Sequence, residues 1–242
     1  MAKKMYVGVN SVARKITSAY VGVNNIARKI TKGYVGVGGI ARQFWPGGGV
    51  IYYGTATALS QARVNLAATT VGNYGLFGGG NDGAFSTHTS VDGYDSTLSH
   101  LTPTALSQKR NALAATSVGN YALFGGGKYQ SGFKTVSTAV VDAYNKSLAH
   151  STPTRLRQAR YALAATTIGN YGLFGGGYDA EGTQEFTNVD AYDTSLSRTT
   201  PTALSRARQD LAATTVGNYG LFGGGRASST AVDTVDAYTF IS

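Results

Sequence analysis

A long repeat constrains the fold of this chain more than any other feature of its sequence. The motif LSxxR, or LRQAR in one copy, begins at Leu59, Leu106, Leu156 and Leu204, so successive copies start 47, 50 and 48 residues apart. Each copy continues into a stretch such as VGNYGLFGGG at 71–80. Repeats with periods of about 20 to 50 residues build solenoids or propellers, because one unit cannot bury its apolar surface alone.

Each long repeat predicts four β-strands separated by turn residues. In the first copy these are LAATTV at 66–71, YGLFGG at 74–79, SVDGYD at 90–95 and a stretch ending in LTPT at 101–104. The fourth stretch is expected at the outer edge, because proline cannot donate to a β-ladder and recurs there as Pro103, Pro153 and Pro201. The small side chains of AATT place the first strand near the axis of a closed array. The sequence therefore predicts an all-β fold.

The two ends of the repeat region predict how such an array closes. The last repeat stops at Ser242 after its third strand, and residues 51–58, IYYGTATA, stand where the other repeats have their fourth. We therefore expect residues 50–242 to form a four-bladed β-propeller closed by strand 51–58. Closure within one chain is favoured, although an exchange of strands between chains would use the same residues.

The first 49 residues form a different segment. Residues 1–49 contain five lysines, three arginines and no acidic residue, a charge of +8, whereas the rest of the chain has 13 basic and 12 acidic residues. Pro46-Gly47-Gly48-Gly49 reads as the linker between the two segments. The segment is expected to be a β-hairpin array used for assembly or attachment.

Three short repeats of 14 residues, beginning at Tyr6, Tyr20 and Tyr34, fill this basic segment. Each has a turn pair, Asn10-Ser11, Asn24-Asn25 or Gly38-Gly39, between two β-rich runs, which is typical of hairpins with type I′ turns. With Val23 opposite Ile26, one apolar face contains Val21, Val23, Ile26 and Ile30. Because isolated hairpins are only marginally stable, this face should dock on another copy, on the rest of the chain or on an acidic partner.

Two resemblances follow from these motifs. The glycine pair followed by VDxYD resembles the kelch motif, so residues 51–242 resemble a kelch-type β-propeller. The short repeats, of the form YVGVNxxARK, resemble arrays in structural proteins of phages and prophages of Gram-positive bacteria.

These resemblances imply a non-enzymatic virion structural protein, associated with a tail or fibre, whose propeller loops bind a glycan or protein on the host surface. Residues 1–49 would contact other virion proteins or further copies of the chain, and a homo-oligomer on the particle is expected. The sequence has no apolar run that predicts a secretion signal or a membrane span, so assembly in the bacterial cytoplasm and release by lysis are expected.

One arginine and one aspartate recur in every long repeat and are expected to form structural pairs between strands, because a ligand site is rarely needed in four equivalent places. These residues are Arg63, Arg110, Arg160 and Arg208, with Asp92, Asp142, Asp190 and Asp236.

The loops after each GGG differ in length, charge and aromatic content, whereas residues 59–80 and 204–225 agree at 19 of 22 positions. Binding residues tend to lie on loops held by a rigid scaffold, so the diverse loops are the predicted binding face. The alternative is that these loops vary without selection. The candidate binding residues are Phe85, His88, Tyr129, Phe133, Lys134, Tyr178, Glu185, Phe186 and Arg226.

No cofactor or metal is expected. The chain has no cysteine, and His88, His100 and His150 do not recur as a ligand set. Two other functions stay open as alternatives: a polysaccharide-active enzyme, which would need paired carboxylates, and nucleic-acid binding through the basic segment. Nucleic acid is not the expected partner, because few aromatic residues are interleaved with the basic ones.

Overall fold

The computed structural model describes residues 52–83, 86–181 and 184–240, together with the backbone of six strands between residues 6 and 45. The chain divides into two compact units, Met1–Ala56 and Thr57–Ser242. All regular secondary structure in the described residues is β-strand. Among them, no helix is long and apolar enough to cross a membrane.

The first unit contains three antiparallel hairpins, each a separate two-stranded sheet. Val23 pairs with Ile26, which confirms the predicted register, and Val21 lies opposite Arg28. The predicted turn pairs and Ile30 lie outside the described residues. The hairpins are β1 (Tyr6–Val9) with β2 (Val12–Lys15), β3 (Tyr20–Val23) with β4 (Ile26–Lys29), and β5 (Gly33–Val37) with β6 (Ile40–Trp45).

In its described residues, the second unit contains four main antiparallel sheets, one for each long repeat, and two short two-stranded sheets in the loops between strands. The first comprises β7 (Ala67–Val71), β8 (Tyr74–Gly78), β9 (Val91–Tyr94) and β10 (His100–Leu101). The second comprises β11 (Ala114–Val118), β12 (Tyr121–Gly125), β15 (Val141–Asn145) and β16 (His150–Ser151). The third comprises β17 (Ala164–Ile168), β18 (Tyr171–Gly175), β19 (Val189–Tyr192) and β20 (Arg198–Thr199). The fourth has three strands, β21 (Ala212–Val216), β22 (Tyr219–Gly223) and β25 (Val235–Thr239).

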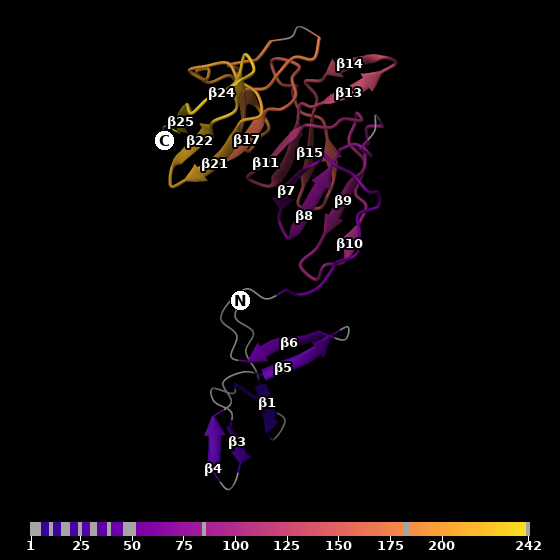
Figure 1. The fold of residues 1–242 in the computed structure, drawn as a ribbon, viewed down its shortest axis with the longest axis vertical. Coiled ribbons are helices and arrows are strands. Elements are labelled where there is room, and N and C mark those ends of the chain that lie inside the picture. Colours follow the sequence, from indigo (N-terminus) through magenta and orange to yellow (C-terminus); the bar gives the residue numbers. More distant parts are fainter. Residues whose placement is uncertain are drawn as a thin grey trace. The chain divides into compact units, whose positions relative to one another are not determined.

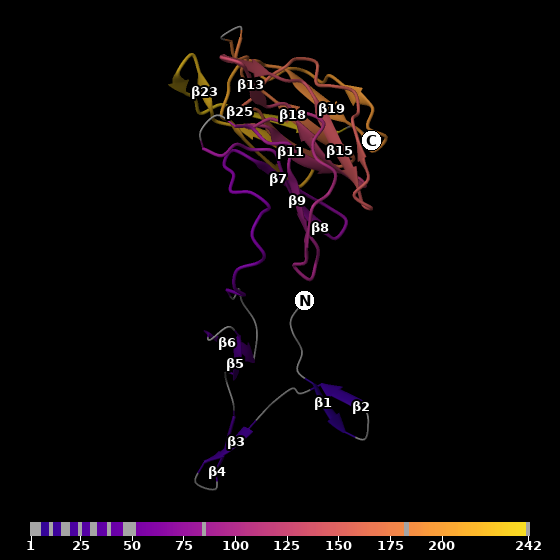
Figure 2. The ribbon, with the colours of Figure 1, turned by 90° about the vertical axis from the view of Figure 1, so that its right-hand side faces the viewer.

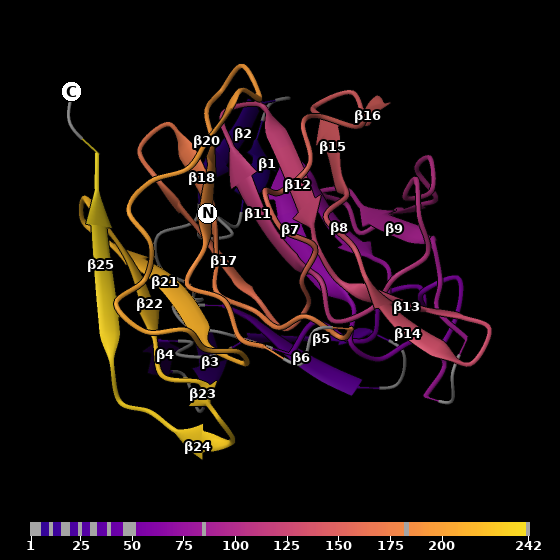
Figure 3. The same ribbon diagram turned by 90° about the horizontal axis from the view of Figure 1, so that it is seen from above.

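The sheets stack in chain order, as Figure 3 shows from above. Strands β7, β11, β17 and β21 contact one another in succession, so the AATT-type strands are the inner ones. Apolar side chains fill each junction: Val71, Leu76 and Phe124 belong to one buried cluster between the first and second sheets. Equivalent clusters lie between the second and third sheets and between the third and fourth.

The predicted closure by strand 51–58 is wrong for this arrangement. Residues 52–58 contain no strand, and the fourth sheet ends at β25. The carbonyl of Thr57 accepts a hydrogen bond of 2.7 Å from the hydroxyl of Tyr94 in the first sheet, and the same bond recurs at Thr104, Thr154 and Thr202 in the other repeats. Because this bond ties Thr57 to the first sheet, the preceding residues could pair with β25 only if the fourth sheet lay against the first. The described sheets instead form an open stack.

The recurring arginine and aspartate of each repeat form a buried ion pair. The guanidinium of Arg110 donates to Asp142 at 2.5 Å and to the Phe124 carbonyl at 3.1 Å. An imidazole and a backbone N–H complete the site, since His150 and the Ser107 N–H both donate to the other carboxylate oxygen. The same pairing joins Arg63 to Asp92, Arg160 to Asp190 and Arg208 to Asp236.

These hydrogen bonds determine the charge state of the buried aspartates. Burial alone would raise the pKa of Asp142, but the Arg110 guanidinium and the Ser107 N–H hold that pKa below its usual range. For Asp92, burial again opposes the shift, and hydrogen bonds from Ser60 and His100 lower the pKa. Asp92 and Asp142 therefore stay ionised inside the stack, where each links the strands that carry its hydrogen-bond partners.

Candidate binding face

The diverse loops gather at one end of the sheets. Two of the loops contain a second hairpin, β13 (Lys128–Ser131) with β14 (Lys134–Ser137) and β23 (Arg226–Ala227) with β24 (Thr230–Ala231), and the other two have an isolated bridge in its place, Asn81 to Thr87 and Tyr178 to Glu185. Strands β13, β14 and β24 lie at the same end of the unit (Figure 1), and β13 and β23 do so in the turned view (Figure 2). We call this end the hairpin face.

The segments that precede each sheet hold these hairpins in place. Asn111 pairs with Lys128, and the equivalent bridges join Tyr161 to Tyr178 and Gln209 to Arg226. The glycine before each hairpin makes the approach possible. Gly127 has φ of +108°, and a Cβ there would lie 2.8 Å from the Asn111 carbonyl oxygen. The variable residues therefore stand on a frame that the repeated glycines and bridges define.

The opposite end is built from short turns with little variation. The β-turn glycine Gly72 lies against Lys146 of the next sheet, and Gly119 lies against Thr194. In the turn after β9, the Asp95 carboxylate accepts hydrogen bonds from the N–H groups of Thr97 and Ser99. Asn145 and Asp193 form the same turn in the next two sheets. The turns at this end are alike in the first three sheets, whereas the loops at the hairpin face differ from one sheet to the next.

A groove opens beside the β13–β14 hairpin. It is lined by one aromatic ring, Tyr129, one guanidinium, Arg155, and a row of hydroxyl and amide groups over an aliphatic floor. The lining residues are Ser107, Gln108, Tyr129, Ser137, Thr138, Ala139, Val140, Val141, Thr152, Pro153, Arg155 and Ala159. Such a lining can stack on a sugar ring or peptide and donate hydrogen bonds to its oxygen atoms. None of these lining residues is an acid or a histidine, so the groove itself holds no acid–base pair.

A second group of side chains joins three sheets on the hairpin face. The Lys128 ammonium lies 4.0 Å from the centroid of the Tyr161 ring. The ring of Tyr178 packs edge-on against Tyr161 with centroids 5.7 Å apart. Asp210 then pairs with Arg226 at 2.5 Å, and its charge acts on Lys128 and Tyr161. We call these five residues the inter-sheet cluster.

Burial sets the ionisation of this cluster. It lowers the pKa of Lys128, which the negative charge of Asp210 partly offsets. It also raises the pKa of Tyr161, so that phenol stays protonated and available as a hydrogen-bond donor. The cluster therefore presents cations and phenolic hydroxyls beside a single carboxylate.

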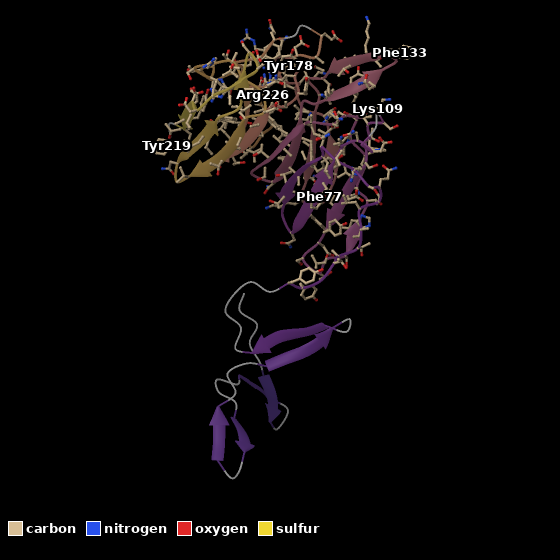
Figure 4. All side chains as sticks on the ribbon, in the orientation of Figure 1. Phe77, Lys109, Phe133, Tyr178, Tyr219 and Arg226 are labelled. Carbon is tan, nitrogen blue, oxygen red and sulfur yellow. The ribbon has the colours of Figure 1, made fainter. Side chains whose placement is uncertain are left out.

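The structure places the predicted binding residues at several points rather than in one site. Tyr129 lines the groove, and Phe133 and Lys134 are exposed at the tip of the adjacent hairpin. Tyr178 and Arg226, labelled with Phe133 in Figure 4, belong to the inter-sheet cluster. Glu185 accepts a hydrogen bond of 3.0 Å from the Ser228 N–H and so links the loops of two sheets. Phe85 lies outside the described residues.

Two predicted binding residues are structural instead. Phe186 is only 6% exposed, so the expectation that it faces a ligand is wrong. Its N–H donates to the Gly177 carbonyl, and its own carbonyl accepts from the Arg208 N–H. His88 makes the equivalent backbone bonds to Gly80 and Arg110, and its ring Nε2 is buried without a hydrogen-bond partner among the described residues. His88 and Phe186 therefore occupy the equivalent loop position, at which backbone hydrogen bonds fix the chain before it enters the next strand of the sheet.

The sequence argument missed Lys128, Arg155, Tyr161 and Asp210. A signal for two of them was present: the position after the recurring arginine reads Val64, Asn111, Tyr161 and Gln209, and the next reads Asn65, Ala112, Ala162 and Asp210. Variation at these two places, inside an otherwise repeated frame, marks them as part of the diverse face. Their contacts could not be foreseen, because they join different sheets.

Neither a family model nor a curated protein matches the chain. Within the part of the chain that the structure describes, no three histidine, cysteine or carboxylate side chains converge as a metal site. His100 in β10 and His150 in β16, the outer strands of the first two sheets, donate to the buried aspartates.

Proposed function

We propose that this chain is a non-enzymatic structural and attachment protein of a phage or prophage particle. Its second unit acts as a scaffold of the kelch propeller type, with the four sheets as blades, and its hairpin face binds a glycan or protein on the host surface. The closed ring of such a propeller is not part of the arrangement described for one chain. Residues 1–49 connect the scaffold to other virion proteins or to further copies of the chain.

The observation that carries this proposal is the contrast between the two ends of the sheets. One end repeats the same short turns, whereas the other holds hairpins of different length and charge on a common frame. A scaffold that varies only where its loops emerge is suited to recognition, because new side chains can be displayed without changing the packing beneath them. The particle setting is supported by the resemblance of the short repeats to arrays in phage structural proteins.

The groove indicates the chemistry of the ligand. Tyr129 supplies a flat apolar surface, Arg155 supplies a charge for a carboxylate or phosphate, and the hydroxyl groups between them match a polyol. A cell-wall glycan with acidic groups has all three features. A surface protein segment rich in acidic residues is the second candidate, because the inter-sheet cluster adds Lys128 and Arg226 to the same face.

Binding of the intact protein to a glycan array and to cell-wall polymers of Gram-positive bacteria tests this proposal. We expect Tyr129→Ala and Arg155→Ala each to weaken binding by about tenfold or more, since each removes a contact worth about 1.4 kcal/mol or more. Lys146→Ala is the matched control, because Lys146 is an exposed cation at the opposite end. Binding that survives both groove variants, or that is lost equally in the control, would argue against recognition through this face.

A further inference from the structure

The three junctions between successive sheets use one set of contacts. A Cβ on Gly78 would lie 2.8 Å from the Phe124 ring of the next sheet. The same contact brings Phe174 against Gly125 and Phe222 against Gly175, at 2.8 and 2.7 Å. Each phenylalanine is fully buried by it. Because the same glycine and phenylalanine meet at all three junctions, successive sheets pack against each other in the same way at this contact.

Backbone hydrogen bonds repeat across the same junctions. Ala112 donates to the Asn65 carbonyl at 2.9 Å, Ala162 to Ala112 at 3.0 Å and Asp210 to Ala162 at 2.9 Å. Gly80 and Gly127 donate in the opposite direction, to the carbonyls of Arg110 and Arg160 in the following repeat, both at 2.9 Å. Each repeat thus offers both donors and acceptors to its neighbours.

The first and fourth sheets each expose one of the two surfaces that meet at the internal junctions. On the fourth sheet, Val216 is 58% exposed, whereas its counterparts Val118 and Ile168 are 1% and 4% exposed. A Cβ on Gly223 would meet only Val235 at 3.5 Å, so the place taken by a phenylalanine elsewhere is open. Tyr219, labelled in Figure 4, adds a further exposed ring to this sheet.

On the first sheet, the matching half is Phe77 with Gly75. Phe77 is partly exposed where Phe124 and Phe174 are buried. A Cβ on Gly75 would meet nothing within 4 Å, whereas one on Gly220 would lie 2.6 Å from Ile168. The first sheet thus has the surface that fits a fourth sheet, and the fourth sheet has the surface that fits a first.

We propose that two copies of this chain associate head to tail, with the first sheet of each copy stacked on the fourth sheet of the other. The interface repeats the internal junction: Phe77 of one copy covers Gly223 of its partner, and the partner's Val216 covers Gly75. Two such interfaces join the copies into one ring of sheets, a number of blades within the range of about four to eight seen in propellers.

The structure favours a second copy over closure within one chain. The three junctions hold the end sheets apart, with both end surfaces exposed, as the opposite positions of β25 and β9 in Figure 3 show. Closing four sheets on themselves would require all three well-packed junctions to change together. A second copy extends the existing junction unchanged, and it also lies beside the edge of β25 that lacks a fourth strand.

The test measures the mass of the full chain by sedimentation and light scattering. We expect a species of at least twice the 25.1 kDa of one chain, and we expect Gly75→Leu to halve that mass. Gly75→Ala is the matched control and should keep the larger mass, because Ala122 already occupies the equivalent place at an internal junction. Unfolding midpoints of the dissociated variant check that its sheets remain folded.

A second variant tests the head-to-tail geometry. Gly223→Leu fills the place proposed for Phe77 and should also halve the mass. Mixed in equal amounts, Gly75→Leu and Gly223→Leu should form a heterodimer, since the mixture retains one junction with two unaltered surfaces. A wild-type chain of 25.1 kDa at high concentration, or a mass that neither leucine variant changes, would overturn the proposal. The latter result would assign association to the basic segment, and neither result bears on binding through the hairpin face.

Discussion

The buried aspartates show how a few side chains stabilise a fold with short strands. The side chains of Asp142 and Arg110 are fully buried, and each carboxylate oxygen accepts at least one charge-assisted hydrogen bond. Charges placed away from water are costly unless they are paired and hydrogen-bonded, so each pair depends on both partners. The pair between Asp210 and Arg226 has the same two charges, but its side chains are 47% and 54% exposed and so remain in contact with solvent.

Removing the carboxylate charge at these two places should therefore have unequal effects. Asp142→Asn leaves the Arg110 guanidinium buried without its counter-charge, and we expect the free energy of unfolding to fall by about 3–5 kcal/mol. Asp210→Asn, the matched control at an exposed pair, should change it by less than about 1 kcal/mol. Urea unfolding followed by circular dichroism measures both. Equal losses would show that the buried pair has no special role.

Acid should destabilise the protein through the same aspartates. The pKa values of Asp92, Asp142 and Asp236 are lowered in the folded state from an ordinary value of 3.8, so the unfolded chain binds protons first as the pH falls. The free energy of unfolding should be constant above about pH 5 and should decrease below about pH 4. Because Asp142→Asn lacks one of these groups, its difference from wild type should shrink between pH 6 and pH 3. A difference that grows on acidification would contradict the assigned direction.

At the scale of the elements, the repeat accounts for most of what could be predicted. The strand pattern, the inner position of AATT and the edge position of the fourth strand follow from alternation, small side chains and proline. The second hairpins were not foreseen, because β13 and β14 lack an alternating apolar pattern and depend on bridges to the preceding segment. Phe186 was assigned to the binding face because its loop is diverse, although its place in the loop is the repeated position that returns the chain to the sheet.

The junction glycines give a prediction for a single element. Gly125→Ala places a methyl group 2.8 Å from the Phe174 ring, and we expect a loss of about 1–3 kcal/mol in the free energy of unfolding. Gly75→Ala adds the same methyl group where nothing lies within 4 Å, so it should be neutral or should stabilise by about 0.5–1 kcal/mol. Thermal or urea unfolding of the two variants measures the contrast. A harmless Gly125→Ala would mean that the junction packs less closely than described.

At the scale of the whole molecule, counting strands predicts a ring closed by residues 51–58, whereas the described sheets form an open stack. Thr57 contacts Tyr94 as the equivalent threonines contact theirs in the other repeats, but β25 lies at the far end of the stack from the residues that precede Thr57. Sequence repeats define the surface that each sheet needs, because every unit carries both halves of the junction. The repeats do not determine whether an end sheet is covered by a sheet of the same chain or by a sheet of another chain, because this depends on the angle between successive sheets.

An engineered disulfide tests this account most directly, because the natural chain has no cysteine. A Cβ on Gly220 lies 3.8 Å from the Cβ of Ile168 at an internal junction, close to the separation of about 3.8 Å in disulfides. The double variant Gly75→Cys and Val216→Cys places this pair on the two end sheets, and Ile168→Cys with Gly220→Cys is the internal control. After oxidation we expect the end-sheet variant to migrate as a covalent dimer on a non-reducing gel, while the control stays a monomer. A single chain closed by its own disulfide, or no disulfide at all, would contradict head-to-tail assembly.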